Sequence, residues 1–131
     1  EVTGLEEFRN RELSQLSGGQ RQRVFIAMAL AQNTKILFLD EPTTYLDIRY
    51  QLDILRLVKK LNREYGITIV MVLHEINQAI HFSDEVIGLK DGKVLVQGDP
   101  KDVITTESIS ELYDVHLNVA DIDGQKFVLT V

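Results

Sequence analysis

The sequence contains no cysteine, and this absence excludes two kinds of stabilising structure. Disulfide bonds and thiolate metal sites both need cysteine sulfur, so neither can occur in these residues. Long apolar runs are also missing, because no run approaches the roughly 18 residues that a membrane-spanning helix needs. We therefore expect any contact with a membrane to go through a partner protein.

Positive charge is scarce as well. The chain has 14 lysine and arginine residues against 20 aspartate and glutamate residues, which gives a formal net charge of −6 at pH 7. This balance argues against a broad surface for nucleic acid or anionic lipid. Glutamate and glutamine are interleaved with Arg9, Arg11, Arg21 and Arg23, and we interpret these arginines as part of a solvated face.

The apolar residues that are present suffice for one core. The 131 residues are 44% hydrophobic, and we predict a single domain over residues 1–131. Apolar residues recur at helical spacing after Ser17, which predicts a helix to about Ala31. A continuous apolar run over residues 36–39 ends at Asp40-Glu41-Pro42. This arrangement is typical of a buried parallel strand whose acidic residues emerge at its carboxyl end.

A second helix and strand follow. Helical spacing from Ile48 predicts a helix that Gly66 ends in the left-handed conformation. Residues 68–73 are β-branched and apolar, so they predict another buried strand. The order strand, helix, strand indicates a right-handed βαβ unit of an α/β fold, with ligands bound beyond the carboxyl ends of the strands. Glu41 and His74 both follow such ends.

Turn residues organise the rest of the chain. Asp91-Gly92 and Asp123-Gly124 are strong signals for two β-hairpins. The other elements that we predict are a helix over residues 75–82, strands over 85–89 and 93–97, and helical segments at 101–104 and 108–113. No internal repeat or long linker is present, so nothing in the pattern calls for a second domain.

The motif Leu16-Ser17-Gly18-Gly19-Gln20 stands at the start of the first predicted helix. A serine hydroxyl and glycine amides at a helix N-terminus form a donor-rich, partly positive surface that suits a phosphate group. The simpler alternative is that Ser17 only caps the helix and the glycines only form a turn.

Simple alternatives also exist for the polar residues at the strand ends. Asp40 and Glu41 could be surface acids that end a strand. Asp47 could cap the helix that starts near Ile48, together with any other role. A lone histidine such as His74 is more often structural than catalytic. These features nevertheless occur in one order along the chain, and the order changes their interpretation.

Together the segments resemble the ATP-binding-cassette (ABC) ATPases. Leu16-Ser17-Gly18-Gly19-Gln20 matches the signature of that family, residues 36–41 match its Walker B strand, Thr43-Thr44-Tyr45-Leu46-Asp47 resembles its D-loop, and His74 occupies the place of its switch histidine. The resemblance implies a partial P-loop NTPase (RecA-like) parallel sheet with helices, followed by C-terminal β-hairpins, in a truncated ABC ATPase domain.

The resemblance implies that two segments act between the subunits of a homodimer. Ser17, Gly18, Gly19 and Gln20 would face the γ-phosphate of an ATP molecule bound to the other subunit. Asp47 would communicate across the dimer.

The resemblance also implies the catalytic residues. Asp40 would hold Mg²⁺ through water, because Mg²⁺ keeps several of its waters in protein sites. Glu41 would orient and deprotonate the attacking water. His74 would contact the γ-phosphate and link it to Glu41.

One element of the family is not found. No G-x-x-x-x-G-K-[ST] segment, the Walker A loop that grips ATP, occurs in the 131 residues. We therefore interpret the chain as the C-terminal part of a longer subunit and expect these residues alone neither to bind ATP tightly nor to hydrolyse it. The Walker A strand would lie in the same sheet as residues 36–39, so we also expect an uncovered apolar surface and self-association that covers it.

Within the family, the segments DEPTTYLDIRYQLDIL and VMVLHEINQAIHFSDEVI are similar to subunits that power uptake of iron–siderophore complexes or related chelates such as cobalamin. This similarity implies ATP and Mg²⁺ as cofactors, permease subunits and, indirectly, an extracytoplasmic binding protein as partners, and a peripheral place on the cytoplasmic face of the cell membrane. Two alternatives stay open: a non-hydrolysing binding or regulatory module, and the ATPase head of a DNA-repair or chromosome-structure protein. Sustained heptads and a basic surface, which such heads need, are missing.

Overall fold

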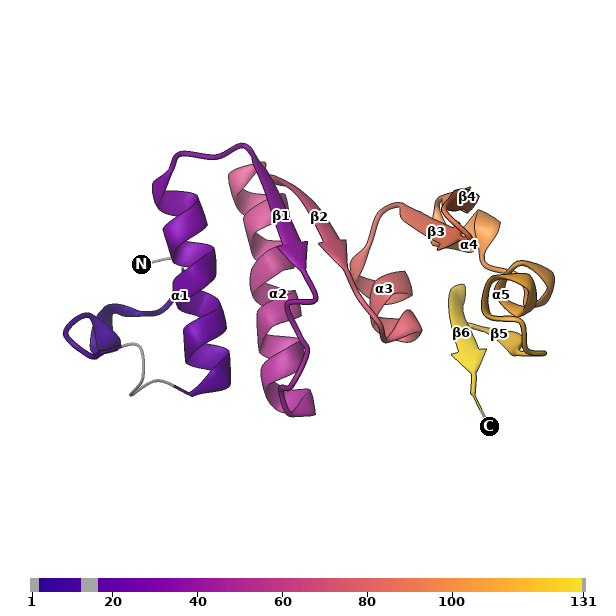
Figure 1. Ribbon diagram of the computed structural model, residues 1–131, viewed down its shortest axis with the longest axis horizontal. Coiled ribbons are helices and arrows are strands. Elements are labelled where there is room, and N and C mark those ends of the chain that lie inside the picture. Colours follow the sequence, from indigo (N-terminus) through magenta and orange to yellow (C-terminus); the bar gives the residue numbers. More distant parts are fainter. Residues whose placement is uncertain (1–2, 13–16, 131) are drawn as a thin grey trace. The chain divides into compact units, whose positions relative to one another are not determined.

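A computed structural model of the chain describes residues 3–12 and 17–130 (Figure 1). The chain divides between Leu73 and His74 into two compact units. The single domain that the sequence predicts over residues 1–131 stays a prediction.

In the first unit, helices pack on a two-stranded sheet. Its elements are the 3₁₀ helix η1 (Glu6–Phe8), α1 (Gly18–Ala31), β1 (Ile36–Asp40), α2 (Ile48–Tyr65) and β2 (Thr68–Val72). The two strands are parallel, with Phe38 opposite Val70 and Asp40 opposite Val72. Because α2 connects them, the predicted strand–helix–strand unit is confirmed.

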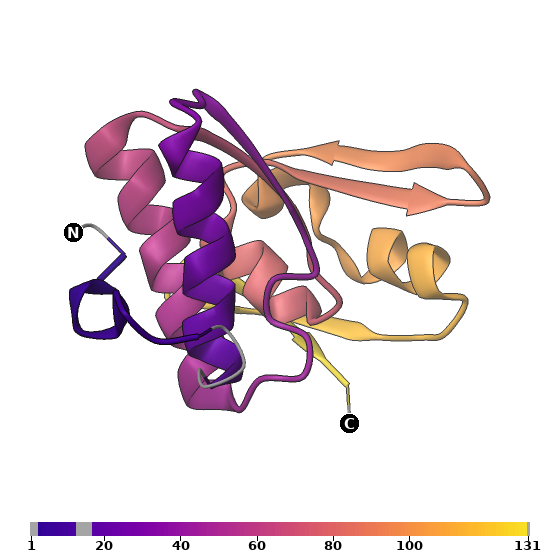
Figure 2. The same ribbon diagram turned by 60° about the vertical axis from the view of Figure 1, so that its left-hand side comes forward.

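The core of this unit lies between the helices and one face of the sheet. Its buried residues are Ile26, Leu37, Ile54, Leu57, Val58, Leu61 and Ile67. Four of them recur at helical spacing in α2, which explains why this segment forms a helix with one apolar face. Gly66 ends α2 with φ at +65°, a conformation that glycine adopts without steric cost. α1 lies beside α2 in both views (Figures 1 and 2).

The opposite face of the sheet is exposed, which corrects the prediction of two fully buried strands. Side chains alternate between the two faces of a strand, and only the face with Leu37 meets the helices of this unit. Phe38 is 74% exposed, and Ile36, Val70 and Val72 are about half exposed on the same face. The apolar sequence of β1 and β2 suits burial on both faces, but the described residues of this unit supply a cover for one.

The second unit consists of short helices and two β-hairpins. Its elements are α3 (Ile76–Phe82), β3 (Val86–Lys90), β4 (Lys93–Gly98), α4 (Pro100–Val103), α5 (Thr106–Tyr113), β5 (Asn118–Ile122) and β6 (Gln125–Leu129). Both hairpins turn where the sequence predicts, because Asp91-Gly92 and Asp123-Gly124 all have positive φ angles.

A small core and an amide side chain hold the second unit together. Ile80, Ile104, Ile109 and Val128 form its buried cluster. The side chain of Asn77 in α3 accepts a hydrogen bond from the Val128 amide at 2.8 Å and donates one to the Val128 carbonyl oxygen at 3.1 Å. α3 is thereby fixed to the edge of β6.

Candidate functional site

The signature segment, residues 17–20, begins α1 with a capping box. The Gln20 amide donates to Ser17 Oγ at 3.2 Å, and the Ser17 amide donates to Gln20 Oε1 at 2.9 Å. Ser17 is thus a helix cap, as the simpler alternative held. Its hydroxyl hydrogen is not used in this box and can still be donated to an anion. Leu16, the first residue of the motif, lies outside the described residues.

The two glycines occupy the first two positions of α1. Amides at these positions have no acceptor within the helix, so the Gly18 and Gly19 N–H groups are the donors that the helix start offers to a phosphate. The partial positive charge of the helix N-terminus adds to this effect. The cap and the anion-binding surface therefore belong to one structure and do not compete.

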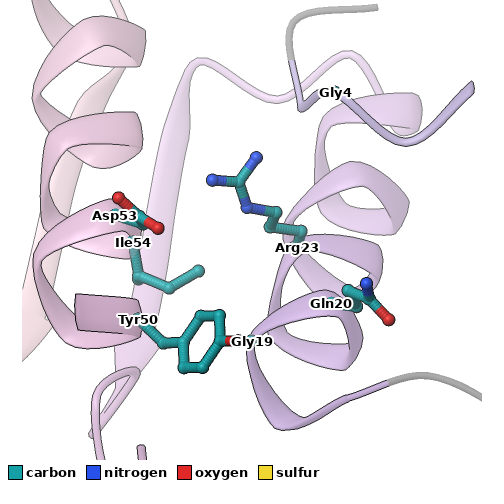
Figure 3. A pocket seen from close by; sticks show the side chains of 7 residues that line it. All are labelled: Gly4, Gly19, Gln20, Arg23, Tyr50, Asp53 and Ile54. Atoms are coloured by element: carbon teal, nitrogen blue, oxygen red, sulfur yellow. The ribbon is translucent and has the colours of Figure 1, made fainter. Parts of the chain in front are cut away.

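Both glycines also pack closely against later residues. A Cβ at Gly18 would stand 2.9 Å from Leu46 Cδ2, and a Cβ at Gly19 would stand 3.1 Å from Tyr50 Cδ1. Figure 3 shows the Tyr50 ring beside Gly19. Sequence reasoning missed Leu46 and Tyr50 as neighbours of the signature segment, because no local pattern reports a contact between segments about 30 residues apart.

Asp40 and Glu41 stand at the carboxyl end of β1. Asp40 is exposed, and Glu41 is half-buried. The Glu41 amide donates to the Val72 carbonyl oxygen at 3.0 Å, which continues the ladder one residue past the strand. Glu41 has φ at +52°, a left-handed conformation that costs a non-glycine residue free energy. Such strain is often found at functional positions, and here it turns the chain directly after the two carboxylates.

The loop over residues 43–47 joins Glu41 to α2. The Thr44 amide donates to the Glu41 carbonyl oxygen at 3.3 Å, and the Leu46 amide donates to the Thr43 carbonyl oxygen at 3.4 Å. Tyr45 is fully exposed and also left-handed, with φ at +64°. Asp47 occupies the N-cap position of α2, but the structure of this segment gives its exposed side chain no capping hydrogen bond. Its carboxylate remains available for another role.

The first unit contains most of the predicted site residues, namely Ser17, Gly18, Gly19, Gln20, Asp40, Glu41 and Asp47. His74 is the first residue of the second unit and follows the end of β2 by two residues. It is exposed, and the next residue, Glu75, caps α3 through its carboxylate, which accepts hydrogen bonds from the Asn77 and Gln78 amides. The cap fixes the direction in which the chain leaves His74.

The carboxylates at the end of β1 suit Mg²⁺ better than they suit a metal ion whose ligands all come from the protein. In the part of the chain that the structure describes, no cluster of three histidine, cysteine, aspartate or glutamate side chains could hold a metal. Asp40 alone offers an exposed carboxylate at the strand end. Mg²⁺ is commonly bound by one or two carboxylates, with water and substrate phosphates as its other ligands.

A cavity of about 170 Å³ adjoins the signature segment in the first unit (Figure 3). Its lining residues are Gly4, Gly19, Gln20, Arg23, Tyr50, Asp53 and Ile54. Arg23 is half-buried there and donates to the Thr3 carbonyl oxygen at 3.1 Å, so its interpretation as part of a solvated face is wrong. The cavity thus joins the start of α1 to residues of α2 and to Gly4.

Comparisons with known proteins show which family the sequence resembles. Residues 1–44 match the family described as ABC transporter. The chain is 50% identical over 118 residues to the petrobactin import ATP-binding protein FpuC of Bacillus anthracis, covering 90% of this chain and 43% of that protein. It is 46% identical over 121 residues to the ferric enterobactin transport ATP-binding protein FepC of Escherichia coli, covering 92% and 45%.

Solved structures give the same result for the fold. A structure described as a metal-chelate type ABC transporter in an inward-facing conformation superposes with a TM-score of 0.85 at 30% identity, over 96% of this chain and 51% of that one. A dimeric ATP-binding cassette in a post-hydrolysis state, bound to ADP and phosphate, gives a TM-score of 0.63 at 47% identity, over 75% and 42%.

The chain is therefore homologous to part of the ATP-binding proteins of ABC transporters and has the α/β fold of solved ABC ATPase structures. More narrowly, it is homologous to ATP-binding proteins of siderophore and ferric-chelate import. It spans less than half the length of these curated relatives. The relatives named here are transport proteins, which favours this class over the ATPase head of a DNA-repair protein.

Proposed function

We propose that this chain is part of the ATP-hydrolysing subunit of an ABC transporter that imports an iron–siderophore complex or a related metal chelate. The observation that carries the proposal is the placement of Asp40 and Glu41 at the carboxyl end of β1, with Glu41 held at a strained turn. Ligands of parallel α/β sheets bind beyond such ends. The names of the relatives support the class of cargo.

Glu41 is the general base in this proposal. Its carboxylate orients the attacking water and accepts a proton from it, which is the help that phosphoryl transfer needs from protein groups. His74 contacts the γ-phosphate and links it to Glu41. The hydrogen bond from the Glu41 amide to Val72 keeps the backbone of Glu41 at the strand end.

Asp40 binds Mg²⁺ through water. A magnesium ion at that place would neutralise charge on the phosphates of ATP. The exposed carboxylate of Asp40 supports this choice of metal, and so does the lack, among the described residues, of any group of three ligating side chains.

The signature segment acts on a second ATP molecule. We infer that the hydroxyl of Ser17 and the amides of Gly18 and Gly19 bind the γ-phosphate of ATP held by the other subunit of a homodimer, while Gln20 completes the cap. Asp47 communicates across that dimer. The solved dimeric cassette supports a dimeric assembly.

The proposed assembly includes permease subunits and, indirectly, an extracytoplasmic binding protein. None of the helices described for this chain is long and apolar enough to cross a membrane. From the import relatives we infer that the subunit acts at the cytoplasmic face of the membrane, through contact with the permease.

The test uses a chimaera that joins this chain to the Walker A-containing part of the Bacillus anthracis relative. We expect the chimaera to hydrolyse Mg-ATP and Glu41→Gln to lower kcat on the order of 10²- to 10³-fold. Glu64→Gln, at an exposed glutamate of α2, is the matched control and should leave kcat unchanged. A chimaera that folds and binds ATP without hydrolysing it would instead support a non-hydrolysing module.

A further inference from the structure

The side chain of Leu46, in the loop before α2, and that of Tyr50, in the first turn of α2, pack closely against the two glycines of the signature segment. Leu46 and Tyr50 are four residues apart, and they meet Gly18 and Gly19 respectively. The 2.9 Å and 3.1 Å distances from their side chains to the missing Cβ positions leave no room for a methyl group without movement. The Leu46 contact is with the flexible end of a side chain, so the ring of Tyr50 makes the firmer of the two contacts.

Leu46 itself is held both by its side chain and by its backbone. Its side chain packs against the core of the first unit, beside Ile26, Ile54 and their neighbours. Its carbonyl oxygen accepts a hydrogen bond from Gln51 Nε2 at 2.7 Å, and its amide donates to the Thr43 carbonyl oxygen at 3.4 Å. A residue held in this way moves together with its loop, so a displacement of the loop is passed on to the residues that it contacts.

The same loop begins at Glu41. The Glu41 amide donates to the Val72 carbonyl oxygen. Within the loop, the Thr44 amide donates to the Glu41 carbonyl oxygen and the Leu46 amide donates to that of Thr43. Two residues of this segment, Glu41 and Tyr45, are left-handed. Left-handed φ angles cost free energy at residues other than glycine, so the surrounding structure must hold this turn in place.

We propose that Leu46 and Tyr50 are positioning residues, which set the direction of the Gly18 and Gly19 amides and thereby link the loop after Glu41 to the signature segment of the same chain. The effect of these two residues on catalysis rests on the proposed function. In a dimer where Glu41 and the signature segment of one chain serve two different ATP molecules, the contact couples the two ATP sites.

The first experiment is a double-mutant cycle in the chimaera. Gly19→Ala adds a methyl group against Tyr50 and should lower kcat on the order of tenfold with less than a twofold change in KM, since a small misplacement of a binding group is costly. Tyr50→Ala removes the opposing ring atoms. The double variant should recover at least about threefold in kcat over Gly19→Ala alone, which is a coupling of ordinary size for residues in contact.

Conservative variants separate positioning from general damage. Tyr50→Phe keeps the ring and should retain kcat, KM and the Hill coefficient for ATP. Tyr50→Leu keeps most of the volume but not the flat ring, and should lower kcat and the Hill coefficient. Tyr65→Ala, at an exposed tyrosine of the same helix, is the matched control and should change none of the three.

The second readout does not depend on activity. The chain has eight glycines, so glycine-selective ¹⁵N labelling of the 131-residue chain gives a simple amide spectrum. Tyr50→Leu should shift the Gly18 and Gly19 resonances and leave those of Gly92 and Gly124 in place. Tyr50→Phe and Tyr65→Ala should leave all of them in place.

The outcomes distinguish the two proposals. An inactive parent chimaera contradicts the proposed function, while the glycine spectrum still tests the contact. An active parent in which the effects of Gly19→Ala and Tyr50→Ala simply multiply overturns the positioning role, and so does a Tyr50→Leu spectrum with unmoved Gly18 and Gly19 resonances.

Discussion

The backbone amide of Glu41 donates a hydrogen bond of 3.0 Å to the carbonyl oxygen of Val72, although Glu41 has left the β conformation with φ at +52°. The parallel pairing of β1 with β2 therefore extends to the residue that turns the chain. A carboxylate at this place starts from a backbone fixed by the sheet, so little reorganisation is needed before it acts on a water molecule.

The left-handed turn at Tyr45 predicts a stabilising substitution. Tyr45 is fully exposed at φ +64°, so Tyr45→Gly loses no packing and relieves the strain. We expect the free energy of unfolding to rise by about 0.5–1 kcal/mol. Urea unfolding followed by circular dichroism measures it. Tyr45→Ala also removes the ring but keeps the strain, so an equal gain in Tyr45→Ala would contradict this explanation.

Nucleotide binding by the 131-residue chain should be weak. These residues contain no Walker A motif, whose backbone amides and lysine supply most contacts to the phosphates. Isothermal titration with Mg-ATP should give no micromolar binding, whereas the chimaera should bind. A micromolar dissociation constant for the chain alone would contradict the expectation.

The exposed face of the sheet predicts self-association of the same chain. Phe38 and Val70 lie opposite each other and leave a contiguous apolar surface. Light scattering over a concentration series should give a mass above that of a monomer. Phe38→Glu combined with Val70→Glu should restore the monomer mass, while Tyr45→Glu, an exposed aromatic outside this face, should not. A monomer mass for the parent at every concentration would overturn the prediction.

Alkaline pH should destabilise the second unit. Asp114, which accepts a hydrogen bond from Lys90 Nζ at 2.6 Å, raises the pKa of Lys90 above its ordinary value of 10.5. Burial raises the pKa of Tyr113 above its ordinary 10.0, and the charge of Glu75 adds to this shift. A raised pKa in the folded chain means that the stabilisation is complete below the ordinary pKa and is lost as the pH rises through the raised one.

The free energy of unfolding should accordingly fall as the pH rises above about 10. Tyr113→Phe removes one of the two groups and should make the fall shallower, whereas Tyr45→Phe should not. Urea unfolding at several pH values from about 8 to about 11 gives the slope. A slope that Tyr113→Phe leaves unchanged would show that Tyr113 does not contribute.

Local signals explain why most elements could be predicted from the sequence. Gly66, Asp91-Gly92 and Asp123-Gly124 all adopt the positive φ angles that their residue types favour, so the ends of α2 and both hairpin turns follow from adjacent residues. The cap at Ser17 is equally local, since its partner Gln20 is three residues away.

Features that depend on distant residues were not predictable in this way. The apolar run of β1 indicates that both faces suit a core, but it does not say what covers each face. The contact of Tyr50 with Gly19 joins two helices, and no periodic pattern in the sequence indicates it. The left-handed φ of Glu41 is also invisible, because glutamate is not a residue that favours it.

Asn77 and His81, one helical turn later, affect whether the edge of β6 can pair with another chain. Asn77 occupies both hydrogen-bonding groups of Val128, and His81 Nε2 lies 3.2 Å from the Lys126 carbonyl oxygen on the same edge of β6. An unpaired strand edge is a template for strand addition by another chain. Side chains of α3 block this edge where a third strand would bind, so amyloid-like growth could not begin at β6 while α3 stays folded.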